Sequence, residues 1–208
     1  MEEFNIEFYI PKTQAERDII VEELPKVDWD SYFMYRAFCM AAQSPDAQTK
    51  QGMVLVDTPS HRVITEGFNG FPPGVDDSAL PRYRDDKYEY MVHCEPNAWG
   101  WAAKLGAHFD DVTIYSTMTP CETCVRNHIT AVTNLKIKRL IYWEYRKFPA
   151  AEKILKLYPH IIMEQFEGGM ERILESQVGH IPLQYMMCTP QHDRLDVGWT
   201  ESYSVGTT

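Results

Sequence analysis

The first clear pattern along the chain is helical, because apolar residues recur at spacings of three and four across residues 31–43. The residues that share this face are Phe33, Ala37, Met40 and Ala41. A buried-strand pattern at 52–57 and a returning strand at 62–66 follow, on either side of the turn-forming stretch Thr58-Pro59-Ser60-His61. The pattern therefore predicts a core helix followed by a β-hairpin.

Helices and strands alternate through the middle of the chain. Helical patterns at 92–105 and 121–132 are separated by a strand pattern at 111–117, and a further strand pattern follows at 140–143. The resulting order is β-β-α-β-α-β. This order is typical of an α/β fold in which helices cover a mixed sheet.

The two ends of the chain are predicted to be extensions of one central domain, residues 28–150. The N-terminal extension, residues 1–27, holds one predicted helix at 14–24. The C-terminal extension, residues 151–208, begins with three weaker patterns: helices at 150–157 and 169–176, and an edge strand at 161–163. Its last thirty residues show no clear period.

Composition narrows the class of protein. The chain has 208 residues, of which 44% are hydrophobic and 24% are charged, and these proportions fit an ordinary globular protein. No apolar run approaches the roughly 18 residues that a membrane helix needs, and the first residues lack the pattern of a signal peptide. Five cysteines, an odd count, fit a reducing compartment better than a secreted disulfide scaffold. We therefore expect a cytoplasmic protein without a membrane partner.

Two short motifs supply the candidate chemistry: His93-Cys94-Glu95 and Thr119-Pro120-Cys121-Glu122-Thr123-Cys124. One imidazole and two thiolates, from His93, Cys121 and Cys124, would give zinc three protein ligands and leave the fourth position for water. Glu95 follows the histidine closely enough to handle the protons of that water without binding the metal. Together and in this order, H-x-E and P-C-x-x-C form the signature of zinc-dependent base deaminases.

We expect both motifs to lie at helix starts. His93 would open the first metal-bearing helix, and Pro120 suits the first position of the second, where its missing N–H costs nothing. Cys121 and Cys124 would then share one face of the opening turn. Free N–H groups and the positive end of the helix dipole would stabilise their thiolates. Two helix starts would thus face each other around one zinc ion.

The C-x-x-C pair could instead be a redox pair or half of a structural zinc site. A structural site needs a fourth ligand at matching spacing, and the remaining cysteines, Cys39, Cys94 and Cys188, form no second C-x-x-C. We expect Cys94 to pack as a small hydrophobe. Glu95 favours a catalytic zinc site, because a purely structural site has no use for a carboxylate there.

The net charge of the chain indicates which class of partner it can bind. The net charge is −10, whereas binding a nucleic-acid backbone usually needs a basic face that releases counterions. The composition therefore disfavours a nucleic-acid partner and favours a free nucleotide. Arg82, Arg84 and Lys87 are candidate phosphate ligands, although for each one a solvated loop position is the favoured interpretation.

With these motifs, the chain resembles the deoxycytidylate (dCMP) deaminase family of the cytidine deaminase-like superfamily, from about Trp29 to Trp143. The other motifs that carry the resemblance are Gly67-Phe68-Asn69-Gly70-Phe71-Pro72, Gly74-Val75-Asp76-Asp77, Leu80-Pro81 and Pro96-Asn97-Ala98. The resemblance implies a three-layer α/β/α fold with a mixed sheet of roughly five strands. It separates the chain from tRNA adenosine deaminases and nucleoside cytidine deaminases, which share only the metal motifs.

The resemblance implies a hydrolase that converts dCMP to dUMP and ammonia, with zinc as cofactor and Glu95 as the catalytic residue. It also implies that Asn69 contacts the sugar or phosphate, although an asparagine between glycines also occurs simply as a turn former. Met53 and Pro120 are further candidate substrate-binding residues. Met53 departs from the family pattern, as does Cys94, and it bears on the identity of the base or of its 5-substituent.

Several alternatives stay open. The substrate could be dCTP or a 5-modified cytosine nucleotide instead of dCMP. Less favoured are an editor of tRNA or other nucleic acid and a non-catalytic, zinc-stabilised subunit. The resemblance further implies a homo-oligomer, with a hexamer favoured, that is activated by dCTP and inhibited by dTTP, with Mg²⁺ accompanying the effector nucleotide.

Overall fold

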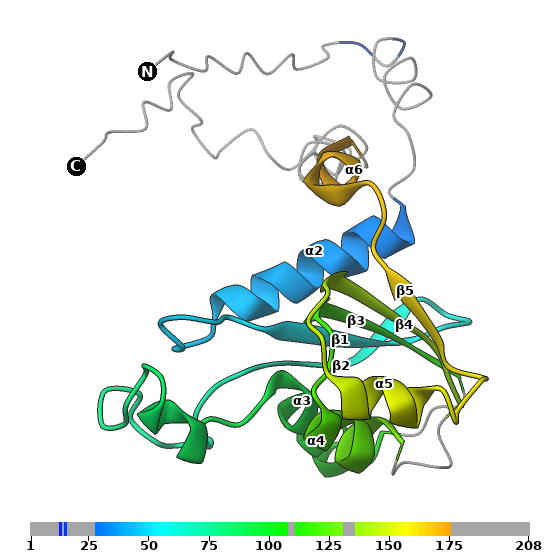
Figure 1. Cartoon of the computed structure of the whole chain (residues 1–208). Coiled ribbons are helices and arrows are strands. Elements are labelled where there is room, and N and C mark those ends of the chain that lie inside the picture. The colour runs from blue at the N-terminus through cyan, green and yellow to red at the C-terminus, as the bar shows by residue number, and fades with distance from the viewer. Residues whose placement is uncertain (1–12, 14, 16–27, 108–110, 131–135, 176–208) are drawn as a thin grey trace. The chain divides into compact units, whose positions relative to one another are not determined.

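A five-stranded sheet with the order β2-β1-β3-β4-β5 forms the centre of the fold (Figure 1). Its strands are β1 (Gly52–Asp57), β2 (Arg62–Phe68), β3 (Asp111–Met118), β4 (Lys136–Glu144) and β5 (Ile162–Gln165). β1 pairs antiparallel with β2 and β3, whereas β3 pairs parallel with β4 and β4 with β5. The prediction of a mixed sheet of roughly five strands is therefore confirmed.

The computed structural model describes residues 13, 15, 28–107, 111–130 and 136–175. The predicted N-terminal helix lies almost entirely outside these residues, and so does the stretch from residue 176 onward. All of the strands and helices named here belong to one compact unit, Val27–Val178. Within the described residues, none of the helices has the length and apolarity that a bilayer crossing requires.

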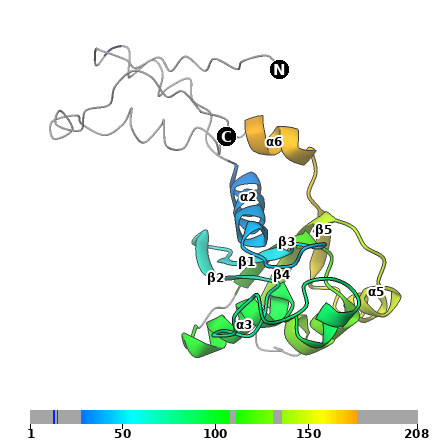
Figure 2. The ribbon, with the colours of Figure 1, turned by 90° about the vertical axis from the view of Figure 1, so that its left-hand side faces the viewer.

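Helices cover both faces of the sheet, which gives three layers (Figures 1 and 2). One face carries α2 (Trp29–Ala42), with α6 (Gly169–Glu175) beside it. The opposite face carries α3 (Cys94–Lys104), α4 (Glu122–Cys124) and α5 (Pro149–Leu155). Two short helical turns complete the fold: a 3-10 helix η1 (Asp86–Glu89) before α3, and a π-helical turn η2 (Val125–Ile129) directly after α4. The α/β/α prediction is confirmed.

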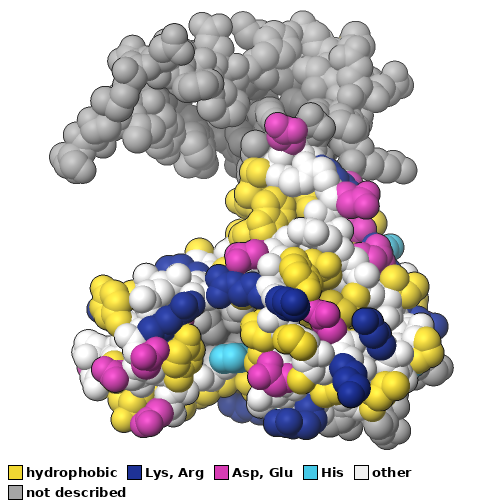
Figure 3. All heavy atoms as spheres, viewed as in Figure 1, with side chains coloured by type: hydrophobic (Ala, Val, Ile, Leu, Met, Phe, Trp, Pro, Cys, Tyr) yellow, Lys and Arg dark blue, Asp and Glu magenta, His cyan; other side chains and the backbone are white. Residues whose placement is uncertain are grey.

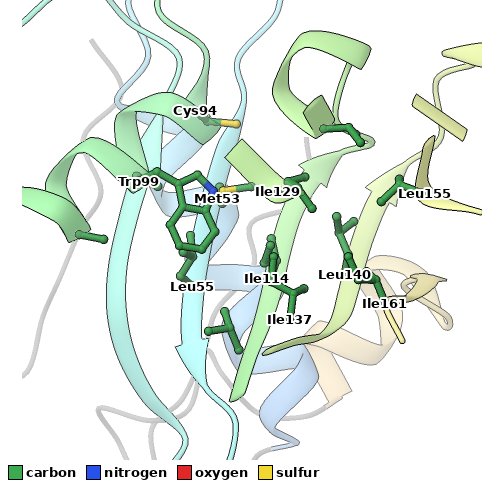
Figure 4. Packing of buried hydrophobic residues seen from close by; sticks show 14 of the residues in the cluster. Met53, Leu55, Cys94, Trp99, Ile114, Ile129, Ile137, Leu140, Leu155 and Ile161 are labelled. Atoms are coloured by element: carbon green, nitrogen blue, oxygen red, sulfur yellow. The ribbon is translucent and has the colours of Figure 1, made fainter. Parts of the chain in front are cut away.

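The alternation of side chains along β1 divides the core into two clusters. Met53 and Leu55 point toward α3, whereas Val54 and Val56 pack on the α2 face, because successive side chains of a strand point to opposite faces. Figure 4 shows Met53 and Leu55 beside Trp99 of α3. β1 is therefore buried on both faces, with Met53 and Leu55 on the face beneath α3.

Two glycines let helices approach the hairpin closely. A Cβ atom on Gly52 would lie 2.0 Å from the carbonyl oxygen of Ala37 in α2. A Cβ atom on Gly67 would lie 2.7 Å both from the carbonyl oxygen of Cys94 and from the amide nitrogen of Ala98. The first turns of α3 therefore pack directly against the backbone of β2.

The stretch that follows residue 150 completes the sheet and its cover. α5 buries Ala151 and Leu155 in the same cluster as Trp99, and β5 pairs with β4 as the edge strand. Residues 151–175, expected from the sequence to form part of an extension, therefore contribute a strand and two helices to the unit Val27–Val178.

An arginine on β4 ties this edge to α2. The guanidinium of Arg139 donates to both carboxylate oxygens of Asp30, at 3.1 and 3.0 Å, and to those of Glu164 on β5, at 2.9 and 3.2 Å. The hydroxyl of Tyr115 donates to the same Asp30 at 2.6 Å. β3, β4, β5 and α2 are therefore held together by one charged network.

Candidate functional site

His93 opens α3. It is the N-cap residue, with extended backbone angles (φ −69°, ψ 162°), and Glu95 is the second residue of the helix. The chain just before His93 is fixed by a two-residue antiparallel bridge, in which Gly70 and Val92 exchange N–H···O bonds of 2.9 and 2.8 Å. The prediction that His93 opens this helix is confirmed.

The helix at the second motif begins later than predicted. Cys121 is the N-cap residue of α4 and Glu122 its first residue, so the placement of Pro120 in the first helical position is wrong. Pro120 instead belongs to the buried turn that leaves β3. That turn is fixed by Thr119, whose hydroxyl donates to the carbonyl of Arg146 at 2.8 Å and accepts from its N–H at 2.9 Å.

α4 does not continue as the regular helix predicted for residues 121–132. After Cys124 it widens into the π-helical turn η2, in which the N–H of Thr130 donates to the carbonyl of Val125 at 2.9 Å. The hydroxyl of Thr130 also donates to that carbonyl, at 3.0 Å. Threonine side chains compete with the helix backbone in this way, and such turns occur often at functional sites.

The two helix starts bring His93, Cys121 and Cys124 together. Nδ1 of His93 lies 3.6 Å from Sγ of Cys121 and 3.4 Å from Sγ of Cys124, and the three ligand atoms lie within 4.8 Å of one another. Tetrahedral zinc, with bonds of about 2.3 Å to sulfur and about 2.0 Å to nitrogen, would separate sulfur and nitrogen by about 3.5 Å. The spacing and the donor types therefore fit one zinc ion.

Hydrogen bonds within this cluster set the protonation of its groups. A hydrogen bond from Cys124, assisted by one from His93, lowers the pKa of Cys121 to about 3. The hydrogen bond between Cys124 and Cys121, together with burial, raises the pKa of Cys124. The hydrogen bond between His93 and Cys121 raises the pKa of His93. One thiolate thus lies between two proton donors at the start of α4.

Glu95 lies beside this cluster and is buried, with 3% of its surface exposed. Its Oε2 accepts a hydrogen bond from Sγ of Cys94 at 3.2 Å. Burial and the adjacent carboxylate raise the pKa of Cys94, so its thiol keeps the proton that it donates. Cys94 also packs in the α3 cluster with Met53, as predicted for a small hydrophobe. Its hydrogen bond to Glu95 was not predicted from the sequence.

Asn69 is buried, and the protein itself uses its amide. Oδ1 accepts from the N–H of Gln51 at 2.6 Å, while Nδ2 donates to Asp46 at 3.1 Å and to the carbonyl of Thr49 at 2.8 Å. The side chain therefore shapes the loop after β2. Met53 is likewise fully buried, beneath α3. Contact of the substrate with Asn69, Met53 and Pro120 stays a prediction.

The three basic candidates for phosphate binding have different surroundings. Lys87 is buried and bonded to Asp46, so it is neither a solvated loop residue nor an accessible phosphate ligand. Arg82 and Arg84 are exposed, and Nη2 of Arg84 donates to the hydroxyl of Thr49 at 2.9 Å. Figure 3 shows Lys and Arg side chains in a band across this face. Exposed basic residues on the loops around the candidate site include Lys50, Arg82, Arg84 and Lys147.

Comparison with known proteins places the chain among zinc-dependent deaminases. Residues 27–144, more than half of the chain, match the family model described as the cytidine and deoxycytidylate deaminase zinc-binding region. The chain is similar to the deoxycytidylate deaminase of Mus musculus, with 32% identity over 142 residues, which cover 63% of this chain and 76% of the mouse protein. A probable deoxycytidylate deaminase of Caenorhabditis elegans is also 32% identical, over 144 residues that cover 64% of this chain and 70% of that relative.

A solved structure supports the fold. The dCMP deaminase from the cyanophage S-TIM5, crystallised in complex with dCMP and dUMP, matches with a TM-score of 0.52 and 19% identity. The match covers 64% of this chain and 93% of the phage chain. At this level of identity the likeness is one of fold, and it agrees with the three layers described above.

Proposed function

The chain belongs to the family defined by the cytidine and deoxycytidylate deaminase zinc-binding region, and from this premise we propose that it hydrolyses dCMP to dUMP and ammonia. The observation that carries the proposal is the juxtaposition of the cluster of His93, Cys121 and Cys124 with the buried carboxylate of Glu95. Relatives named deoxycytidylate deaminase support dCMP as the substrate, as does the phage enzyme, whose complex contains dCMP and dUMP.

We assign zinc to Nδ1 of His93 and to the sulfurs of Cys121 and Cys124. Zinc bound by these residues would supply Lewis-acid chemistry, by which the pKa of a bound water molecule falls toward neutrality. The helix starts at α3 and α4 contribute N–H groups that favour the thiolates, which are the form that binds the metal.

We assign general base and acid catalysis to Glu95. Its carboxylate takes a proton from the attacking water, gives it to N3 of the cytosine ring and then helps to protonate the amine that leaves C4. One carboxylate is sufficient, because it regains its charge when it gives the first proton to N3 and can then carry the proton of the new C4 hydroxyl to the amine. The hydrogen bond from Cys94 holds Oε2, and burial keeps bulk water away from the carboxylate.

A free nucleotide is the substrate class that the charges favour. The net charge of −10 opposes binding to a polynucleotide, whereas a single phosphate needs only a local donor such as the exposed guanidinium of Arg84. We propose that Asn69 contributes to substrate binding by holding the loop after β2 in place. Met53 and Pro120 would then form the buried floor of the base site.

Replacement of Glu95 tests the mechanism. Glu95→Gln should lower turnover of dCMP by at least about 10²-fold, because the proton carrier is lost, while the zinc content stays at one ion per chain. Ammonia release and metal analysis measure the two quantities. Glu171→Gln, an exposed position on α6, serves as the control and should retain wild-type turnover. A Glu95→Gln enzyme with near-wild-type rates would show that the assignment is wrong.

A nucleotide panel tests the substrate. Ammonia release from dCMP should exceed that from dCTP, deoxycytidine and 5-substituted dCMP. A preference for dCTP or for a 5-substituted nucleotide would identify that nucleotide, and not dCMP, as the substrate. Deamination of an oligonucleotide, with binding that weakens steeply as salt rises, would instead indicate a nucleic-acid editor.

Family membership also supports proposals on regulation and assembly. We propose a homo-oligomer, with a hexamer as the first expectation, that dCTP activates and dTTP inhibits in the presence of Mg²⁺. We further propose a cytosolic location, in keeping with the free thiols among the described cysteines. Sedimentation of the purified protein and rates measured with and without each effector test the first two proposals.

A further inference from the structure

Residues 82–90, which lead toward His93, form an exposed stretch with one exception. Lys87 has 2% of its surface exposed, whereas every other residue of the stretch lies in the exposed class. No apolar side chain from this stretch enters the core. Exposed hydrogen bonds also tie the stretch to the segment before β1: the carbonyl of Arg82 accepts from the N–H of Ala47 at 3.3 Å, and the N–H of Arg84 donates to Oε1 of Gln48 at 2.6 Å. Lys87 is therefore the buried anchor of a stretch that is otherwise held only at the surface.

The partner of this cation is equally buried. Nζ of Lys87 donates to Oδ1 and Oδ2 of Asp46 at 2.7 and 2.6 Å, and each side chain is 3% exposed. In every other ion pair within the described ranges, both side chains are at least 23% exposed. Two buried charges are tolerated when they are paired and their remaining hydrogen-bonding capacity is used, and here both conditions hold.

Asp46 connects this anchor to two other segments. Its Oδ1 accepts from the backbone N–H groups of Gln48 and Thr49 at 2.8 and 2.9 Å, and its Oδ2 accepts from Nδ2 of Asn69 at 3.1 Å. Burial opposes the charge of Asp46, but these bonds and those from Lys87 outweigh it and lower its pKa. One carboxylate thus joins the segment before β1, the loop after β2 and the stretch before α3.

The metal-binding cluster is held separately. Phe68 accepts a bond of 2.9 Å at its carbonyl from Nδ2 of Asn97, and Gly70 pairs with Val92, so the start of α3 is fixed to β2 without Lys87. The other two members of the cluster, Cys121 and Cys124, follow β3 in the chain. What Lys87 links is the stretch that carries Arg82 and Arg84 and the carboxylate of Asp46, which also accepts the hydrogen bond from Nδ2 of Asn69.

We propose that the buried Asp46–Lys87 pair positions the substrate-facing loops of the candidate site, with both residues acting as positioning residues. The pair holds residues 82–90 against the loop of Asn69, so that a nucleotide meets a preformed surface. This inference deepens the proposed function and rests on it. Loss of the Asp46–Lys87 pair should weaken substrate binding more than it slows the chemical step.

The single variant Lys87→Met tests this role, because methionine keeps most of the side-chain stem and removes the charge. We expect KM for dCMP to rise about tenfold or more, with kcat within about threefold of wild type and zinc retained. Trypsin should also cleave faster after Arg82 and Arg84. Lys153→Met, an exposed position on α5, is the matched control and should change neither KM nor the rate of cleavage.

The double variant Asp46→Asn/Lys87→Met separates positioning from stability. Removal of both charges leaves no unpaired ion, so the melting temperature should recover relative to Lys87→Met, while KM stays raised and the stretch stays sensitive to trypsin. Recovery of KM together with stability would overturn the proposal, and so would wild-type KM and trypsin resistance in Lys87→Met. Trypsin sensitivity needs no turnover. A wild-type protein inactive on every nucleotide would therefore refute the proposed function while the positioning of residues 82–90 was still tested.

Discussion

Single residues at the start of each helix determine the charge of the metal-binding cluster. Hydrogen bonds from its neighbours lower the pKa of Cys121, at the N-cap of α4, to about 3, whereas the pKa values of Cys124 and His93 are raised. A metal ion must therefore displace protons from two of its three ligands. Metal affinity and pH are linked through these residues.

We expect zinc uptake by the metal-free protein at pH 6 to release about two protons, one from His93 and one from Cys124. Because the pKa of His93 lies above its ordinary value, protons compete with zinc from a higher pH downward, and affinity should fall as pH drops through that pKa. Calorimetric titration in two buffers of different ionisation enthalpy counts the protons. Uptake without proton release would contradict this assignment of charges.

Arg84 supports a second prediction at this scale. Arg84→Ala should raise KM for dCMP about tenfold and leave kcat nearly unchanged, because the guanidinium would contact the phosphate and not the reacting base. Steady-state rates on dCMP and on deoxycytidine measure the effect, which should vanish for the nucleoside. Arg62→Ala, at the exposed start of β2, is the control. An unchanged KM would remove Arg84 from the phosphate site.

At the scale of elements, the contact between α3 and β2 positions His93 and Glu95 relative to the sheet. It depends on Gly67, whose missing side chain leaves room for the backbone of Cys94 and Ala98. Any side chain at this position would push the first turns of α3 outward. The geometry of the candidate site is therefore sensitive to a residue that takes no part in the chemistry.

Gly67→Ala should lower the free energy of unfolding by about 1–3 kcal/mol and reduce turnover, because the new Cβ overlaps backbone atoms that cannot move freely. Gly100→Ala, in α3 itself, provides the control. Gly100 is exposed and has open space around it, so alanine there should stabilise the protein by about 0.5–1 kcal/mol. Denaturant unfolding of both variants measures the difference, and equal effects would refute the close approach of α3.

Local patterns predicted most of these elements, whereas contacts between residues far apart in the sequence could not be predicted. Turn residues and the apolar run 52–56 mark the hairpin of β1 and β2, and each metal motif carries its own fixed spacing, so their positions follow from neighbouring residues. Lys87 was misjudged because its partner, Asp46, lies 41 residues away and resembles an ordinary turn residue. The start of α4 was misplaced because a proline suits both the first helical position and the turn before it.

At the scale of the whole described unit, the elements after residue 150 are part of the core. The buried apolar residues that they contribute are Ala151, Leu155, Ile161, Phe166 and Ile173. Removing them would uncover parts of both clusters and of β4. A domain that ended at residue 150 would lack one edge of its sheet.

We expect a chain cut after residue 150 to lose cooperative unfolding, whereas a chain ending at residue 178 keeps it. Exposing these five side chains and their partners costs on the order of 10 kcal/mol, which is comparable with the whole stability of a typical domain. Thermal unfolding followed by circular dichroism compares the two chains. A sharp transition in the shorter chain would show that residues 28–150 fold alone.

The pairing of β5 with β4 has a consequence for the handling of this protein. β4 contains the run Leu140-Ile141-Tyr142-Trp143, and β5 pairs along one side with its first three residues. Until β5 emerges from the ribosome, or after a protease cuts the connection before it, these N–H and C=O groups offer a template to other chains. Incomplete synthesis or nicking between α5 and β5 should therefore yield insoluble aggregates, and a chaperone that retains the growing chain until residue 165 has appeared should prevent them.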